Sequence, residues 1–327
     1  MKSLLPIAPT QAARRRLLQA LAITPALGIA SAWADDAPLR LGTSTPGGGF
    51  ALYGQALERV LNARAGRALL TVVATNGTNE NLQGLASGEL DIALIQGTSA
   101  NQVLQTQGDA GLRVLYAMYP SPGMLAVPGD STARRLEDLK GESIVFGVPT
   151  SGLVLLARQV FGALGLDIDR DFRAVYVEKA AQSPQRVLDG EAAGLWGAGV
   201  GWPGFTRLAE APRGARFIGP SPAQIPQILQ AQPFLKAMEV PAGAYAGLER
   251  ALPTVGSWNV VLAQATFSEE RAYRLARALH EAAAALAAAL PQAAMSTARL
   301  TVQATPSPAL LHPGTARLLR ELGLLPA

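Results

Sequence analysis

The 327-residue sequence contains no cysteine. This absence excludes disulfide bonds, thiolate metal ligands, cysteine nucleophiles and a lipid-anchored cysteine. Histidine is almost as scarce: the chain has His280, in an alanine-rich helical segment, and His312, before a Pro-Gly turn. We expect structural roles for both. Because histidines and acidic residues nowhere cluster and no Gly-x-Ser-x-Gly sequence occurs, the sequence predicts no metal site and no catalytic residue.

The first 34 residues contain no acidic side chain. A basic run at 14–16 is followed by an apolar stretch at 17–29 and by the small-residue sequence 32–34. This order predicts a secretory signal peptide over 1–34 that is removed by cleavage, and the arginine run also fits a twin-arginine signal. A membrane anchor is the alternative, but the apolar stretch is shorter than the ~20 residues that a spanning helix needs.

Excess positive charge is confined to this leader. The chain has 28 Lys and Arg against 24 Asp and Glu, and four of the basic residues lie in 1–34, which leaves 24 of each sign in the rest. A formally neutral chain excludes nucleic acid as a partner, because such binding needs a basic excess. The remaining 293 residues suit two domains, and we expect a monomer.

A weak internal repeat underlies the fold prediction. A strand, a polar loop with glycine and a helix occur in that order from Gly42 to Gly97, and again from Gly147 to Gly197. The helices are expected at 50–63 and 153–162. Strands that alternate with helices predict parallel, helix-covered sheets, so two copies predict two α/β lobes.

Two extended segments, 112–127 and 254–262, connect the copies. They predict that lobe 1 consists of 35–122 and of 256–327, which includes C-terminal helices, while lobe 2 consists of 123–255. A chain that crosses twice forms a two-strand hinge, and such a hinge permits closure around a ligand.

The loops of the repeat are the candidate binding elements. The loop 46–49 and the loop 150–152 each join the carboxyl end of a strand to the start of a helix, and 76–79 lies in a similar place. Glycines there allow close backbone approach, and helix starts favour an anion. The alternative is that these residues only form turns and caps. A nucleotide cofactor is not expected, since Phe50-Ala51 stands where a P-loop has lysine and serine or threonine.

Several short segments, in this order and spacing, resemble the TAXI family of solute-binding proteins of TRAP transporters. They are 42–49, 74–82, 85–96, 149–152, 241–245, 253–256 and 311–316.

This resemblance implies a periplasmic-binding-protein-like α/β fold and a periplasmic receptor that delivers a small anionic solute to a TRAP permease in the membrane. The solutes that it implies are glutamate-like amino acids and small carboxylates, including dicarboxylates. The positions that it implies for ligand contact are Gly48, Gly49, Phe50, Tyr53, Asn76, Thr78, Asn79, Gln96, Thr150, Ser151, Gly152, Gly199 and Trp202. The bulky Trp202 suggests a ligand with a flat or apolar body.

Two alternatives remain open at this point. The first is the binding protein of an ABC-type importer, which has the same kind of fold and differs in a permease that is not part of this chain. The second is a periplasmic lyase or hydrolase, which would need a titrating pair of side chains in the cleft, and the sequence offers none.

Overall fold

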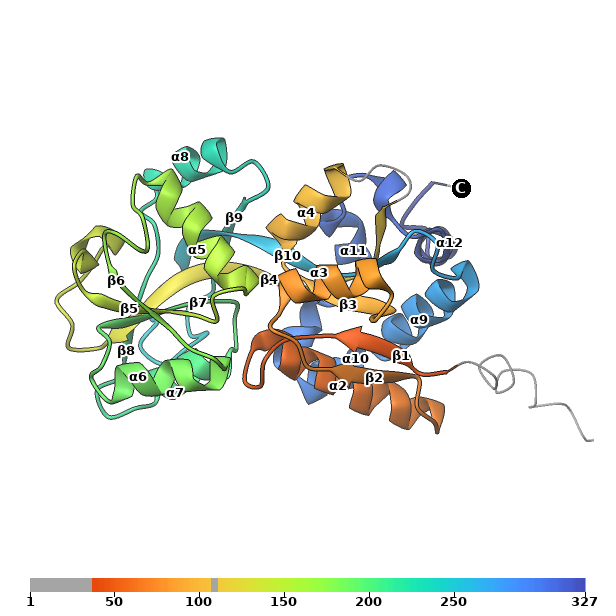
Figure 1. Ribbon diagram of the computed structural model, residues 1–327, viewed down its shortest axis with the longest axis horizontal. Helices are drawn as coiled ribbons and strands as arrows, with labels where there is room; N and C mark the ends of the chain where they lie inside the picture. Colours follow the sequence, from red (N-terminus) through yellow and green to blue (C-terminus); the bar gives the residue numbers. More distant parts are fainter. Residues whose placement is uncertain (1–36, 107–110, 327) are drawn as a thin grey trace, which may run out of the picture. The chain divides into compact units, whose positions relative to one another are not determined.

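The computed structural model describes residues 37–106 and 111–326, and the described residues from Pro38 onward form one compact unit of two lobes (Figure 1). The predicted signal peptide, 1–34, lies outside the described residues. Within the part that is described, no helix is both long and apolar enough to span a bilayer.

Lobe 1 is built from the first repeat and the C-terminal helices. In chain order its elements are β1 (Leu39–Gly42), α2 (Gly49–Ala65), β2 (Leu70–Val73), α3 (Thr78–Ser87), β3 (Ile92–Ile95), α4 (Gly97–Thr106), α9 (Glu269–Glu281), α10 (Ala283–Ala289), the 3-10 helix η5 (Pro291–Met295), α11 (Ala298–Ala304), the 3-10 helix η6 (Pro308–Leu310) and α12 (Pro313–Glu321). Strand β1 pairs in parallel with β2 and β3, as the repeat predicts.

Lobe 2 contains the second repeat. Its elements are the 3-10 helix η3 (Leu136–Leu139), β5 (Ser143–Gly147), α5 (Gly152–Ala163), β6 (Arg173–Tyr176), the 3-10 helix η4 (Ala180–Gln182), α6 (Ser183–Leu188), β7 (Gly194–Ala198), α7 (Pro203–Ala209), β8 (Ala215–Ile218), α8 (Gln224–Ala231) and β9 (Lys236–Val240). Strand β5 pairs in parallel with β6 and β7. The predicted α/β class with two lobes is therefore confirmed.

Two long strands, β4 (Leu112–Pro128) and β10 (Leu252–Gln264), run through both lobes (Figure 1). They pair antiparallel with each other, and they join the strands of both lobes into one ten-stranded sheet. Strand β10 also pairs with β3 of lobe 1 and β9 of lobe 2, while β4 continues along β7 and β8. The predicted lobe boundaries, 122/123 and 255/256, fall inside these two strands and remain a prediction.

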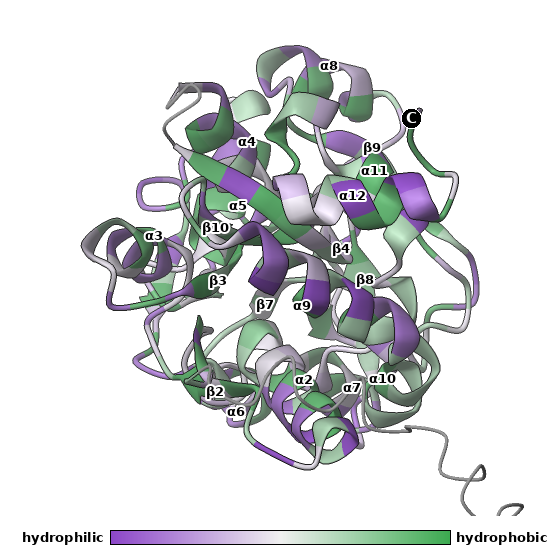
Figure 2. Cartoon of the chain, turned by 90° about the vertical axis from the view of Figure 1, so that its right-hand side faces the viewer, coloured by the Kyte–Doolittle hydropathy of each residue, from purple (hydrophilic) through white to green (hydrophobic). Residues whose placement is uncertain are grey.

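Each lobe has its own apolar core. In lobe 2, Phe161 packs edge-on against both Phe146 and the fully buried Trp196, with ring centroids 5.8 and 5.3 Å apart. In lobe 1 the helices cover the sheet with one face: Figure 2 shows hydrophilic residues on the viewer's side of α9 and a mostly hydrophobic β4 behind it. Separate cores let each lobe behave as a stiff body, because packed interiors resist deformation.

His312 has the structural role that the sequence predicts. Its Nδ1 accepts a hydrogen bond from the amide of Gly314 (3.3 Å) and so caps α12, while its Nε2 lies 3.0 Å from the carbonyl of Phe267. Burial lowers the pKa of His312, so its neutral form is favoured. His280 is exposed in the last turn of α9, which is also consistent with the prediction.

Candidate functional site

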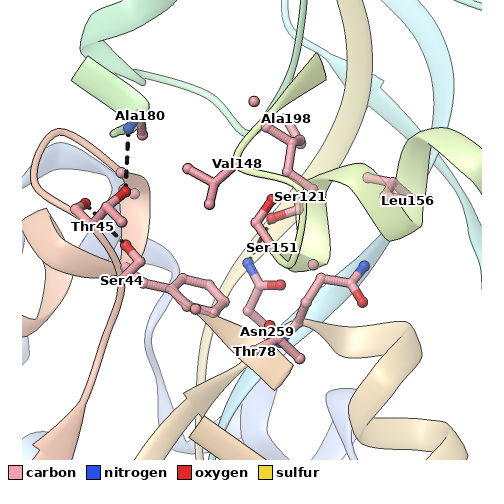
Figure 3. A pocket seen from close by; sticks show the side chains of 18 of the residues that line it. Ser44, Thr45, Thr78, Ser121, Val148, Ser151, Leu156, Ala180, Ala198 and Asn259 are labelled. Atoms are coloured by element: carbon pink, nitrogen blue, oxygen red, sulfur yellow. Dashed lines mark hydrogen bonds between the residues drawn. The ribbon is translucent and has the colours of Figure 1, made fainter. Parts of the chain in front are cut away.

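A cavity of about 840 Å³, including space open to solvent at its mouth, lies between the lobes next to β4 and β10. Its lobe 1 side is formed by the starts of α2 and α3 and by the end of β3. Its lobe 2 side is formed by the starts of α5 and α6 and by Trp202 before α7. Figure 3 shows that Thr45, Val148 and Asn259, which are far apart in the chain, face the same space. The helix starts from both repeats thus meet at one place, as expected from the strand ends.

Most of the predicted contact residues line this cavity. They are Gly48, Gly49, Phe50, Asn76, Thr78, Gln96, Ser151, Gly152 and Trp202.

Four predicted residues do not line it. Tyr53 is fully buried inside lobe 1, where its hydroxyl donates to Ser296 Oγ (3.0 Å) and its ring packs edge-on against Tyr119. Asn79 and Thr150 are exposed and Gly199 is buried, and none of the three lines the cavity. These four occupy the predicted loops and the first helix but are not among the residues that line the cavity, so we leave them out of the proposed site.

Helix starts supply free amide groups to the cavity. Among the described residues, the amides of Gly49 and Phe50 at the start of α2, and of Gly152 and Leu153 at the start of α5, have no acceptor. The first-turn amides of any helix lack partners within the helix and carry partial positive charge. The two lobes therefore present donors to the same space without a cationic side chain.

Both ends of the Gln96 side chain form hydrogen bonds inside lobe 1. Its Nε2 donates to Ser257 Oγ (2.9 Å), and its Oε1 accepts from the amides of Thr98 (2.9 Å) and Ser99 (3.1 Å) at the start of α4. Gln96 therefore caps α4 and gives mainly its hydrocarbon part to the cavity wall. Similarly, the amide group of Asn76 donates to Glu80 Oε2 (2.8 Å).

Direct contacts hold the lobes together around the cavity. The loop 45–47 of lobe 1 accepts a set of hydrogen bonds from lobe 2, which we call the latch. They run from the Ala180 amide to Thr45 Oγ1 (3.2 Å), from the Ala181 amide to the Pro46 carbonyl (3.2 Å) and from Trp202 Nε1 to the Gly47 carbonyl (3.1 Å). The indole N–H of Trp202 is thus engaged by lobe 1, and its ring forms part of the cavity wall.

Two of the loop glycines are needed where the lobes touch. A Cβ on Gly47 would lie 2.6 Å from Ala181 Cβ, and one on Gly152 would overlap Gln96 and lie 2.8 Å from Thr78 Oγ1. The sequence predicts close approach of a ligand at these glycines. The structure shows that the group they approach is the opposite lobe.

Ionisable groups are nearly absent from the cavity wall. Of the described lining residues, none is Lys, Arg, Asp, Glu or His, and Tyr119, the titratable one, has its pKa raised by burial. No cluster of three His, Asp or Glu side chains suited to a metal ion occurs within 37–106 and 111–326. The polar lining consists of hydroxyl and amide groups.

Sequence reasoning missed the floor of the cavity. Ser121 lies on β4, Asn259 on β10 and Gln292 on η5, and all three line the cavity. Asn259 Nδ2 donates to Ser121 Oγ (2.6 Å). The available signal was that Ser121 and Asn259 are polar residues within long apolar strands, since a polar residue in a buried strand needs a specific partner.

Comparison with known proteins agrees with this architecture. The sequence profile of the NMT1-like family matches residues 41–323.

Among solved structures, a periplasmic transporter is similar at 13% identity, covering 87% of this chain and 93% of that chain, with a TM-score of 0.53. The binding-protein component of an ABC phosphonate transporter from Pseudomonas aeruginosa is similar at 14% identity, covering 79% of each chain, with a TM-score of 0.50. A protein from Bordetella bronchiseptica RB50 is similar at 15% identity, covering 88% of this chain and 82% of that chain, with a TM-score of 0.50. At these identities the likeness concerns the fold. The chain belongs to the NMT1-like family and has the two-lobed fold of periplasmic solute-binding proteins.

Proposed function

We propose that this protein is an exported receptor that binds a small organic anion between its lobes and delivers it to a membrane transporter. The observation that carries the proposal is the cavity lined by helix starts of both lobes, next to the two strands that join them. Ligands that bind between two stiff lobes are typically enclosed by hinge closure.

The anionic character of the solute is supported by the free amides at the starts of α2 and α5. Each helix contributes partial positive charge roughly equivalent to half an elementary charge at its start. Two such starts facing one cavity favour a negatively charged group there over a positively charged one.

Periplasmic localisation is supported by the sequence of 1–34, with its basic, apolar and small-residue regions in secretory order. Fractionation of cells that express the full chain tests it. We expect the shortened protein in the periplasmic fraction, and retention of the uncleaved chain in the membrane would favour an anchor instead.

Two kinds of transporter are candidates for the partner. We place an ABC-type importer first, because the similar solved structures include the binding component of an ABC phosphonate transporter. The motifs that resemble the TAXI family support a TRAP permease as the second. Solute uptake into proteoliposomes that contain the cognate permease separates the two: an ABC importer needs internal ATP, and a TRAP system needs an ion gradient.

A thermal-shift and calorimetric screen of the processed protein tests the receptor function. The panel contains monocarboxylates, dicarboxylates, amino acids, sulfonates and neutral analogues. An acid at 100 times its dissociation constant should raise the free energy of unfolding by ~2.7 kcal/mol. Binding of neutral compounds alone would contradict an anion site, and chemical conversion of a stabilising compound would indicate an enzyme.

A further inference from the structure

Two buried carboxamides stand at the floor of the cavity with unused hydrogen-bonding capacity. Asn259 is 1% exposed and Gln292 is 7% exposed, and both line the cavity. Neither Asn259 Oδ1 nor Gln292 Oε1 has a partner among the described residues. Buried polar atoms of native proteins are almost always hydrogen-bonded. Because these two oxygens belong to residues that line the cavity, we infer that a bound molecule supplies the missing donors. In Figure 3 the side chain of Asn259 extends into the space beside Ser121 and Ser151.

The carboxamide of Gln292 favours a ligand group that both donates and accepts hydrogen bonds. Within the described chain, neither end of its carboxamide takes part in a hydrogen bond, whereas Asn259 uses its Nδ2 on Ser121. A carboxamide combines an acceptor oxygen with two N–H donors. A hydroxyl or an amide group of the ligand complements both ends. An ammonium group supplies donors alone and complements only the oxygen of Gln292.

The lack of charged side chains in the described cavity wall also disfavours an ammonium group on the ligand. An ammonium group taken out of water is stable when it is paired with an anion, and the described lining contains no carboxylate. A second carboxylate on the ligand would also find no Lys or Arg there. The free amides at the starts of α2 and α5 suit one anionic group.

Several lining residues are apolar. Phe50 and Val148 stand on opposite lobes, and Leu153 and Leu156 continue the wall along α5. Such a wall favours a hydrocarbon or aromatic ligand body, because burial of apolar surface is favourable.

We propose that the solute is a singly charged organic acid with an apolar body and a hydroxyl or amide substituent that binds Asn259 and Gln292, and that it has no ammonium group. This inference rests on the proposed receptor function and names its substrate class. It narrows the solutes that the sequence resemblance implies, because it disfavours glutamate-like amino acids and dicarboxylates.

Matched compounds test the substituent by isothermal titration calorimetry. One scaffold is phenylacetate, compared with its 2-, 3- and 4-hydroxy derivatives and with phenylglycine. The other is 4-methylpentanoate, compared with its 2-hydroxy derivative and with leucine. On at least one scaffold, we expect a hydroxy acid to bind about tenfold more tightly than the parent acid, and the amino acid to bind more weakly than both.

The outcomes separate this inference from the receptor function. If the amino acid binds as tightly as the best hydroxy acid, or if no hydroxyl improves on the parent acid, the inference is wrong while the receptor stands. If no organic acid in this set or in the wider screen binds, the receptor for anions itself is wrong.

The variant Gln292→Met tests whether Gln292 causes the preference for a hydroxy acid over the parent acid. Gln292→Met keeps the length of the side chain and removes its amide, and no hydrogen bond within the described chain is lost. We expect an unchanged or higher unfolding temperature, and a hydroxy-acid advantage over the parent acid that falls to about twofold or less. The control is Gln159→Met on α5, which removes another buried glutamine oxygen without a partner, outside the cavity lining. It should leave both affinities unchanged. Equal loss of parent and hydroxy acid in Gln292→Met would show that Gln292 only shapes the cavity.

Discussion

Gly152 lies where α5 of lobe 2 meets Gln96 and Thr78 of lobe 1. A methyl group at this position would overlap Gln96 and lie 2.8 Å from Thr78 Oγ1. The nearest atom to the added methyl group is the Cβ of Gln96. This Cβ is fixed to the backbone, so it cannot move aside as the end of a flexible side chain would. The lobes must separate to accommodate it.

We therefore expect Gly152→Ala to fold and to bind its ligand more weakly. Steric overlap of this kind costs about 1–3 kcal/mol, which corresponds to about five- to 150-fold in affinity. Small-angle X-ray scattering of the liganded protein should show a larger radius of gyration than the parent has, and titration calorimetry measures the affinity.

The control for this prediction is Gly162→Ala on the same helix, where a Cβ would meet no atom within 4 Å. It should raise the stability of α5 by roughly 0.5–1 kcal/mol and leave binding unchanged. If Gly152→Ala binds as tightly as the parent, the contact of Gly152 with lobe 1 is not part of the bound state.

Single residues also explain part of what the sequence failed to predict. Tyr53 and Tyr119 are neighbours in space, and the sequence favoured Tyr53 because it follows the first glycine loop. Helix α2 turns Tyr53 into the core, while Tyr119, from β4, reaches the cavity. Loop proximity in sequence does not tell which face of a helix a side chain takes when the partner elements are unknown.

At the scale of elements, the latch joins the loop before α2 to the 3-10 helix η4. Thr45 is buried, and its Oγ1 accepts the hydrogen bond from the Ala180 amide. This bond connects the lobes, so it favours the closed arrangement of the lobes over an open one.

Thr45→Val removes the acceptor at nearly constant volume. A hydrogen bond of this kind contributes about 0.5–1.5 kcal/mol, so we expect ligand release to become about two- to tenfold faster in stopped-flow measurements of tryptophan fluorescence. Thr43→Val in the same loop is the control, because its hydroxyl donates to the Val73 carbonyl inside lobe 1 (3.1 Å). This control should lower the free energy of unfolding without a change in release rate; equal acceleration in both variants would mean that the latch does not govern release.

The elements themselves were predicted unevenly. The helix expected at 50–63 is α2, and the one expected at 153–162 is α5, since both have apolar faces of helical period. Helix α4 was missed because its sequence, rich in Gly, Ser, Thr and Asn, has low helix propensity. It is stabilised by the side chain of Gln96 at its start, a contact that depends on the position of β3.

At the scale of the whole molecule, β4 and β10 make the two lobes one sheet. Unfolding of either lobe would remove hydrogen-bond partners and packing from these strands in the other. We expect one cooperative thermal transition, with equal calorimetric and van't Hoff enthalpies in differential scanning calorimetry. A bound ligand should shift this transition as a unit. Two separate transitions would show that the lobes unfold independently.

The sequence by itself determined the α/β class, the two copies of the strand–loop–helix unit and the two extended crossings at 112–127 and 254–262. These features are local, since they depend on apolar periodicity and on glycine and polar residues at strand ends. Most of the loop residues that it nominated do line the cavity for the same reason: strand ends of a parallel sheet lie at one edge.

Only the tertiary structure decided what the cavity can recognise. Asn259, Gln292 and Ser121 come from three elements far apart in the chain, and nothing in their local sequence places them together. The lack of charge at the cavity and the contact of Gly152 with lobe 1 likewise emerge when the crossing strands bring the lobes face to face. Local patterns determine helices and strands, whereas recognition depends on contacts between residues distant in sequence, which exist only in the folded chain.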